Sequence, residues 1–212
     1  MITATIHTKV GEIKRVATQL NRVDKWGAIK LRWRIGRNNY QVEPGLYATG
    51  NPDENSDVFV TANYKLSFDH LRKNLDGLNA WILVLDTKGI NVWCAAGKGT
   101  FGTAELVNRI RITRLKEIIK HRRIIVPQLS ATGVSAYQVK RLTMPETDVN
   151  IQFSNQSPVS FQSLKNNITV DRGFTVVFGP VRAADIKAFI ANGYKSTEEM
   201  RKVSFSFSDR LK

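Results

Sequence analysis

The stretch AWILVLDTKGINVWCAAGKGTFG, residues 80–102, decides the fold of this chain. It opens with an apolar run over residues 81–85, which is too short to span a membrane and is typical of a fully buried parallel strand. Residues 86–89, Asp-Thr-Lys-Gly, predict a turn. A second apolar run over residues 90–96 contains the only cysteine of the chain, Cys94. Small residues surround this cysteine, and such a surface lets a large, flat ligand come close to the backbone.

From the residues alone, Cys94 has two interpretations besides that of a ligand-binding residue. A lone cysteine in an apolar run is most often a small hydrophobic residue of a core. The glycines after it, Gly97, Gly99 and Gly102, have the spacing G-x-G-x-x-G, which alone is a weak signal for nucleotide binding. A phosphate-binding loop ending at residues 97–98 would need glycine at position 92, where the chain has Val92. Nucleotide binding is therefore less favoured, although it stays open.

The composition limits the class of protein. A chain of 212 residues with 42% hydrophobic content can bury one substantial core. One cysteine excludes a disulfide framework and an internal zinc or iron–sulfur site ligated by cysteines, so any low-potential electrons must come from another protein. Residues 1–14 lack the apolar core of a signal peptide, and no window approaches the ~20 apolar residues of a spanning helix. We therefore expect a cytoplasmic protein.

The net charge of +14 raises the question of a nucleic-acid partner. Residues 1–50 carry nine basic and three acidic groups, whereas residues 51–100 carry five and six, so the basicity lies outside the stretch around Cys94. We interpret the basic residues first as a solvated face. An anionic membrane surface or an acidic protein partner is the next interpretation, and nucleic acid is the last, so no nucleic-acid partner is expected.

Strand and helix patterns alternate from residue 58 to residue 192 and predict an α/β fold that is Rossmann-like, with a mostly parallel sheet and helices on both faces. Strands are expected at 58–62, 81–85, 124–126 and 174–178, with an edge strand at 203–207. Helices are expected at 67–75, from 103, at 116–120, 134–142 and 183–192, and weakly at 12–20. Residues 28–42 predict a β-hairpin that turns at residues 36–39.

This pattern divides the chain into two segments, and the second of them contains a polar insertion. Residues 1–50 are expected to be a basic N-terminal segment whose β-hairpin packs on the core, and residues 51–212 to be the α/β domain. Residues 143–172 are polar and without periodicity, and we interpret them as a mobile insertion. In such folds a ligand lies beyond the carboxyl ends of the strands. The residues expected there are Thr61, Asn63, Cys94, Gln128, Leu129, Gly179 and Pro180.

The motif Asn91-Val92-Trp93-Cys94-Ala95-Ala96-Gly97-Lys98 resembles the cap-helix motif of the mercury-methylation corrinoid protein family (HgcA). That family is distantly similar to the large subunit of the corrinoid iron–sulfur protein of acetyl-CoA synthesis. The resemblance extends to GLYATGNPDENS (45–56), VTANYKLSFDHLR (60–72), VLDTKGI (84–90), GTFGT (99–103) and FGPVRAADIKAFI (178–190). It covers most of residues 25–210 and favours a ligand role for Cys94 over a core role.

The resemblance implies cobalamin or a related corrinoid, bound tail-off, with Cys94 as the lower ligand of cobalt and as the catalytic residue. A cobalt-bound thiolate is a strong donor, which favours transfer of the methyl group to inorganic Hg(II) to form methylmercury. The expected corrinoid contacts are Thr61, Asn63, Asn91, Val92, Trp93, Cys94, Ala95, Ala96, Gly97, Lys98, Gln128, Leu129, Gly179 and Pro180. Lys98 is as well explained as a solvated lysine, and Trp93 as a core residue.

The resemblance also implies partners and a place in the cell. A ferredoxin-like iron–sulfur protein is expected as electron donor, and a methylated folate carrier or a methyltransferase as methyl source. The family usually continues into membrane helices beyond the position of Lys212, so a location at the inner face of the cytoplasmic membrane is expected if such helices follow. The family also generally lacks the insertion at 143–172. The alternatives are a corrinoid methyl carrier for another acceptor and a non-catalytic basic binding module.

Overall fold

A computed structural model describes residues 1–32, 40–145 and 172–203 of this chain. Within these ranges seven strands form one sheet in the order β1-β2-β3-β5-β4-β6-β7. The strands are β1 (Ile2–Thr8), β2 (Gly11–Val16), β3 (Gly45–Thr49), β4 (Val58–Ala62), β5 (Ala80–Leu85), β6 (Arg123–Val126) and β7 (Thr175–Phe178). Strands β5, β4, β6 and β7 run parallel to one another, whereas β3 is antiparallel to β5 and β1 to β2. The predicted mostly parallel sheet is confirmed.

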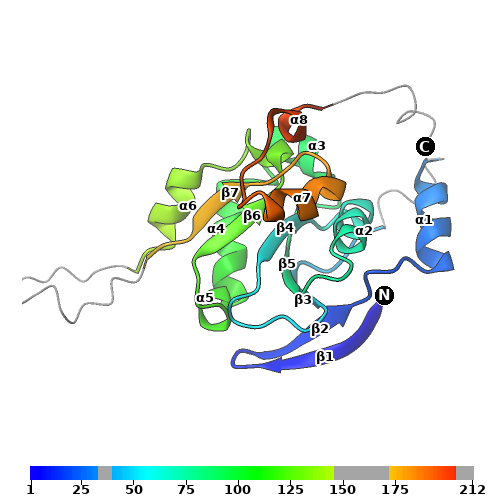
Figure 1. The fold of residues 1–212 in the computed structure, drawn as a ribbon, viewed down its shortest axis with the longest axis horizontal. Helices are drawn as coiled ribbons and strands as arrows, with labels where there is room; N and C mark the ends of the chain where they lie inside the picture. Colours follow the sequence, from blue (N-terminus) through cyan, green and yellow to red (C-terminus); the bar gives the residue numbers. More distant parts are fainter. Residues whose placement is uncertain (33–39, 146–171, 204–212) are drawn as a thin grey trace, which may run out of the picture.

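Helices cover both faces of this sheet (Figure 1). The elements are α1 (Arg22–Arg32), α2 (Lys65–Asn74), α3 (Val92–Gly97), α4 (Thr103–Ile112), α5 (Leu115–Ile118), η2 (Gln128–Ser130), α6 (Ala136–Leu142), η4 (Ala183–Asp185), α7 (Ile186–Ala191) and α8 (Glu198–Arg201). Helices α2 and α7 pack on one face, and α3, α4, α5 and α6 on the other. The α/β class with helices on both faces is therefore confirmed.

Strand β5 shows why a continuous apolar run is needed at the centre of the sheet. Its side chains point alternately to the two faces, because the side-chain period of a strand is two. Trp81, Leu83 and Leu85 join the core under α4, whereas Ile82 and Val84 join the core under α2. All six residues of β5 are buried, as expected for a strand covered on both sides.

The N-terminal β-hairpin is present, but at a different place in the sequence. Residues 2–16 form it as β1 and β2, whereas the prediction placed a helix at 12–20 and the hairpin at 28–42. Residues 22–32 form helix α1 instead of the first hairpin strand. On α1 the buried Asp24 and the tightly packed Gly27 lie three residues apart and face the protein. These tertiary contacts outweigh the local alternation that predicted a strand.

Strand β3 and helix α8 were not predicted, whereas the other predicted strands and helices are observed with shifts of one to three residues at their ends. Helix α2 begins at Lys65 after Tyr64, two residues before the expected cap at Ser67. The turn at 36–39, the insertion between 146 and 171 and the expected strand from 204 onward lie outside the described residues. The sheet continues across the boundary at residue 50, since β3 pairs with β5. The division into residues 1–50 and 51–212 stays a prediction.

Candidate functional site

The connections of the parallel strands create a crevice at their carboxyl ends. From β4 the chain runs through α2 on one face to β5, and from β5 it crosses the other face to β6, on the opposite side of β4. Such a reversal is where open α/β sheets bind ligands. A pocket of about 610 Å³ lies at this point, a volume typical of small-molecule and cofactor sites.

Four parts of the chain line this pocket. The first is the end of β4 with Phe59, Val60, Thr61 and Tyr64, and the second is α2 with Leu66, Ser67, His70, Leu71 and Asn74. The third is the start of α3 with Asn91, Val92 and Trp93. The fourth comprises β6, the segment after it and the segment from the end of β7 into α7, with Ile125, Val126, Pro127, Leu129, Gly179, Pro180, Val181, Arg182, Ala183, Ala184 and Ile186. Most of these residues are apolar, and among the described residues of the lining Arg182 is the only lysine or arginine. The pocket therefore fits a ligand with a large apolar part.

Helix α3 begins and ends through interactions that the motif itself supplies. The Oδ1 atom of Asn91 accepts a hydrogen bond from the backbone N–H of Cys94 at 2.9 Å, which caps the helix. At the other end Gly99 adopts a left-handed φ of 79°, and its N–H donates to the carbonyl of Ala96. Glycine is suited to this position because it has no Cβ to clash.

The two faces of α3 differ in exposure. Val92, Ala95 and Ala96 are buried, whereas Trp93 is 55% exposed and Cys94 is exposed. The small residues of the motif permit close packing of the helix on the domain. A Cβ added at Gly133 would lie 2.3 Å from the carbonyl oxygen of Phe101 and 3.1 Å from that of Ala96. Cys94 is therefore a surface thiol on a tightly seated helix and not a core residue.

The turn that leads into α3 is held by side chains from other elements. Lys88 and Gly89 have left-handed φ values of 58° and 70°. Asp86 receives bonds from Lys88, through Nζ and the backbone N–H, which outweigh partial burial and lower the pKa of its carboxyl. Glu105 of α4 accepts a hydrogen bond from the N–H of Asp86 at 2.9 Å. Asp86 is thus the turn residue that the sequence predicts.

The structure places the predicted site residues in two groups. Those that line the pocket are Thr61, Asn91, Val92, Trp93, Leu129, Gly179 and Pro180. Those outside its lining are Asn63, Cys94, Ala95, Ala96, Gly97, Lys98 and Gln128. Cys94 directly follows the pocket-lining Trp93, while Gly97 and Lys98 are exposed at the end of α3. The buried Asn63 directs its side chain at the turn before α3.

Two walls of the pocket were missed by sequence reasoning. Ser67, His70 and Asn74 of α2 line it, as do Arg182 and Ala184 at the start of η4, although the family resemblance that covers both segments named none of these residues as a contact. The period of α2 indicates its apolar face, which meets the sheet through Phe68 and Leu71. Which of its polar residues meet η4 depends on how the two helices are placed over the sheet.

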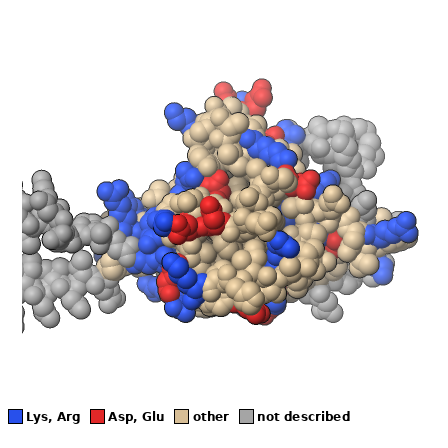
Figure 2. Space-filling view, turned by 60° about the horizontal axis from the view of Figure 1, so that its bottom comes forward, with Lys and Arg blue, Asp and Glu red and all other residues tan. Residues whose placement is uncertain are grey.

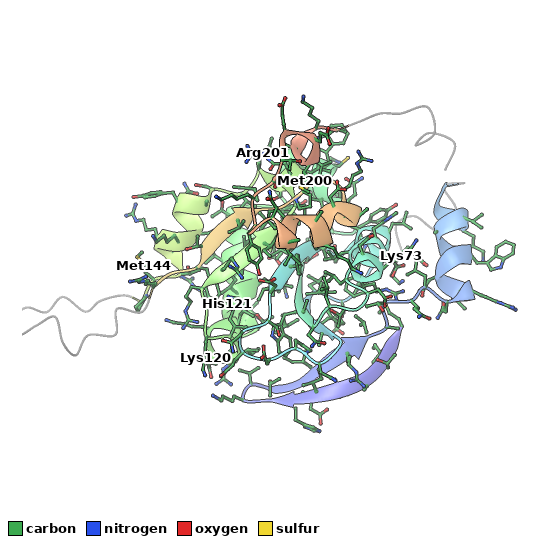
Figure 3. The ribbon with its side chains drawn as sticks, viewed as in Figure 1. Lys73, Lys120, His121, Met144, Met200 and Arg201 are labelled. Atoms are coloured by element: carbon green, nitrogen blue, oxygen red, sulfur yellow. The ribbon has the colours of Figure 1, made fainter. Side chains whose placement is uncertain are left out.

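The histidines of the chain lie in different regions. His7 is in the edge strand β1, and His121 precedes β6 at the amino end of the sheet, where Nε2 lies 3.0 Å from the carbonyl oxygen of Ser56. Figure 3 shows His121 beside Lys120, away from Met200 and Arg201 of α8. Only His70 lines the pocket. No group of three His, Cys, Asp or Glu residues that could hold a metal ion occurs in the described ranges.

Many Lys and Arg side chains gather on one part of the surface that Figure 2 shows. Figure 2 shows Lys and Arg gathered at the end of the molecule that carries α5 and α6, next to a broad surface of other residues. Arg111, Arg114 and Lys116 line a second, smaller pocket there of about 300 Å³. These three residues lie outside the lining of the pocket at the carboxyl ends of the strands. Among the residues that the structure describes, no helix has the length and apolar character needed to cross a membrane.

A Rossmann-like sheet with an apolar pocket at its switch point and an exposed thiol beside it defines an α/β ligand-binding domain. Residues 21–188 match the CO dehydrogenase/acetyl-CoA synthase delta subunit family (CdhD), and the chain belongs to that family.

Curated relatives agree with this family. The chain is 34% identical over 108 residues to the acetyl-CoA decarbonylase/synthase complex subunit gamma of Archaeoglobus fulgidus. The aligned region covers 49% of this chain and 23% of that protein. It is 39% identical over 93 residues to the subunit of the same name from Methanocaldococcus jannaschii, and this aligned region covers 43% of this chain and 19% of that protein. The chain thus spans about a fifth of the length of these relatives.

Proposed function

We propose that this chain is a corrinoid-binding methyl carrier in which Cys94 is the lower ligand of cobalt. The observation that carries the proposal is the position of Cys94, exposed on a capped helix whose preceding residues line the pocket. The similarity to acetyl-CoA decarbonylase/synthase subunits gamma supports a role in methyl transfer. A corrinoid bound here would supply the cobalt that carries the methyl group.

The described residues around the pocket fit a corrinoid in two respects. Cobalt accepts soft thiolate and imidazole donors, and the described part of the chain offers the exposed Cys94 thiol and His70 near the pocket. The apolar lining and the volume of about 610 Å³ suit a bulky appendage of a cofactor better than a compact anion. Of these two donors Cys94 would hold the cobalt, because its thiol is exposed beside the pocket, next to the lining residue Trp93.

The chain's own residues have separate roles in this proposal. Asn91 holds Cys94 in place by capping α3. Trp93 is half exposed at the pocket, where its ring would pack against the cofactor. Lys98 lies in the turn after α3 and offsets the negative charge of the thiolate. The other predicted contacts that line the pocket form its walls, and these are Thr61, Val92, Leu129, Gly179 and Pro180.

The proposed methyl acceptor is inorganic Hg(II), because the motif around Cys94 resembles that of the mercury-methylation proteins. A second acceptor is favoured by the comparisons, whose curated relatives are subunits of acetyl-CoA decarbonylase/synthase complexes. In that case the methyl group passes to a partner subunit of such a complex. Either acceptor requires a methyl source, proposed as a methylated folate carrier or methyltransferase, and a ferredoxin-like electron donor, since the chain has one cysteine.

The first experiment is anaerobic reconstitution with cobalamin, followed by visible absorption spectroscopy of the wild type, Cys94→Ala and His70→Ala. We expect stoichiometric uptake and a tail-off spectrum that changes in Cys94→Ala and is the same in His70→Ala. A change confined to His70→Ala would move the ligand to α2. Failure of all three proteins to retain cobalamin would overturn the corrinoid proposal.

A second experiment separates the two acceptors. The reconstituted, methylated protein is incubated either with Hg(II) and the reducing partner or with a partner subunit of an acetyl-CoA synthase. Methylmercury formed by the wild type and not by Cys94→Ala supports the mercury proposal. Transfer to the partner subunit alone would overturn it and leave the methyl-carrier role in place.

A further inference from the structure

Asn63 follows β4 and joins it to the turn that precedes α3. Its side-chain Oδ1 accepts hydrogen bonds from the backbone N–H of Thr87 at 3.1 Å and of Gly89 at 3.0 Å. The Oγ1 of Thr87 lies 2.8 Å from the same oxygen and 2.7 Å from the carbonyl oxygen of Ile90. Asn63 is 2% exposed and Thr87 is fully buried, so water does not substitute for these bonds.

Two acceptors on the Nδ2 side of the Asn63 side chain set the orientation of its amide group. The Nδ2 atom of Asn63 lies 3.3 Å from Oε1 of Gln41 and 3.4 Å from Oδ1 of Asp86, so both neighbours accept from it. The backbone of Asn63 also donates to the carbonyl of Leu85 and accepts from the N–H of Val42. One residue thus holds the ends of β4 and β5, the segment before β3 and the turn in register.

The turn before α3 and the short helix itself give α3 little stability of their own. Lys88 and Gly89 both occupy the left-handed region, which is costly for a lysine. Helix α3 has six residues and begins directly after the turn, so its own hydrogen bonds stabilise it weakly. A Cβ added at Gly89 would meet Gln41 at 2.6 Å, so the turn is also in close contact with the segment before β3.

We infer that Asn63 and Thr87 are positioning residues that set the place of α3 and thereby aim the Cys94 thiol at the bound cofactor. This inference rests on the proposed function. It assigns Asn63 a role different from that of a corrinoid contact, because Asn63 does not line the pocket and its amide already contacts Thr87, Gly89, Gln41 and Asp86. Asn63 acts on a residue 31 positions later in the chain.

The variants are chosen to preserve shape. Asn63→Asp keeps the accepting oxygen but replaces the Nδ2 donor with a second oxygen, which faces the oxygens of Asp86 and Gln41. Thr87→Val removes the hydroxyl, and Thr87→Ser restores it. Thr49→Val is the matched control, since Thr49 is fully buried and its Oγ1 bonds the carbonyl of Ala80 at the start of β5, away from α3.

The first readout is amide hydrogen exchange of the cofactor-free protein. Leaving a buried polar group unsatisfied costs ~1–3 kcal/mol, so the amides of Gly89 and Ala95 should exchange about tenfold faster or more in Asn63→Asp and Thr87→Val. Exchange within β4 and β5 should stay unchanged, and Thr87→Ser should match the wild type. Equal exchange at Gly89 and Ala95 in Asn63→Asp and in Thr49→Val overturns the inference.

The second readout separates aiming of the thiol from binding. With cobalamin bound, Asn63→Asp and Thr87→Val should give the spectrum of Cys94→Ala while retaining stoichiometric uptake. Uptake with the unchanged wild-type spectrum in both variants would contradict the inference. If the wild type itself takes up no cobalamin, the proposed function fails, and the exchange measurement alone then decides whether Asn63 anchors α3.

Discussion

The Nη2 atom of Arg72 lies 2.7 Å from Oδ2 of Asp24, and this buried ion pair joins α2 to α1. Lys65 approaches the other oxygen of Asp24 at 2.9 Å, and Asp69 bridges Lys65 and Arg72. Arg72 also donates to the carbonyls of Ala17 and Gln19, so the link between β2 and α1 is held as well. The network fixes the N-terminal part of the chain against the α2 wall of the pocket.

This network predicts a specific response to acid. Burial by itself raises the pKa of the Asp24 carboxyl, but the bonds from Lys65 and Arg72 outweigh it and lower the pKa to about 2. The stabilisation from the ionised Asp24 is therefore complete above the ordinary pKa of 3.8 and is lost as the pH falls through about 2. Urea unfolding from pH 7 to pH 2 should show a loss of about 2 kcal/mol from this group.

Asp24→Asn should lower the free energy of unfolding at pH 7 by about 3 kcal/mol, because Asp69 is then the one carboxylate of the network left to balance Lys65 and Arg72. The acid dependence should flatten at the same time. Glu198→Gln is the control, since its pair with Lys202 is exposed and should contribute less than about 0.5 kcal/mol. Equal effects of the two substitutions would show that the Asp24 pair does not stabilise the fold.

Gly133 and Gly97 should respond in opposite ways to alanine. Gly133→Ala introduces a methyl group 2.3 Å from the carbonyl oxygen of Phe101 and should destabilise the protein by about 1–3 kcal/mol. Gly97→Ala meets nothing within 4 Å in α3 and should be neutral or stabilising by up to about 1 kcal/mol. Chemical denaturation of both variants tests the packing of α3. A tolerated Gly133→Ala would contradict it.

Asn91→Ala should remove the cap of α3 and cost about 1 kcal/mol, because the N–H of Cys94 loses its acceptor. Asn91→Asp keeps the acceptor and should restore the helix. Ser135→Ala removes the corresponding cap of α6, where Ser135 accepts from the N–H of Gln138. Both alanine variants should lose similar stability, but only Asn91→Ala should alter the spectrum of bound cobalamin.

Trp93 and Trp26 are both exposed tryptophans, so substitutions at the two positions can be compared directly. Trp93 lines the pocket and is 55% exposed, whereas Trp26 on α1 is 64% exposed and lies outside the lining. Either alanine substitution should change the free energy of unfolding by less than about 0.5 kcal/mol. Trp93→Ala should weaken cobalamin binding about tenfold, as expected for an aromatic anchor, and Trp26→Ala should leave it unchanged. Equal affinities of the two variants would remove Trp93 from the site.

The parts of the fold that depend on local chemistry were predictable. The apolar residues of β5 predict a buried strand and the sequence Asp-Thr-Lys-Gly predicts a turn, and both are observed. The hairpin of β1 and β2 was missed although β1 carries the alternation of a strand, with Ala4 and Ile6 half-buried and Thr5 and His7 exposed. The alternation at residues 29–32 predicted a strand, yet residues up to Arg32 are helical.

The sequence by itself determined the α/β class, the central buried strand and a capped segment that carries a single cysteine, because these depend on neighbours within a few residues. Only the tertiary structure decided that α2 and η4 wall the pocket and that Asn63 holds the turn before α3. It also decided that Cys94 faces solvent while Ala95 and Ala96 face the core. These relations join residues distant in the chain, and packing of whole elements sets them.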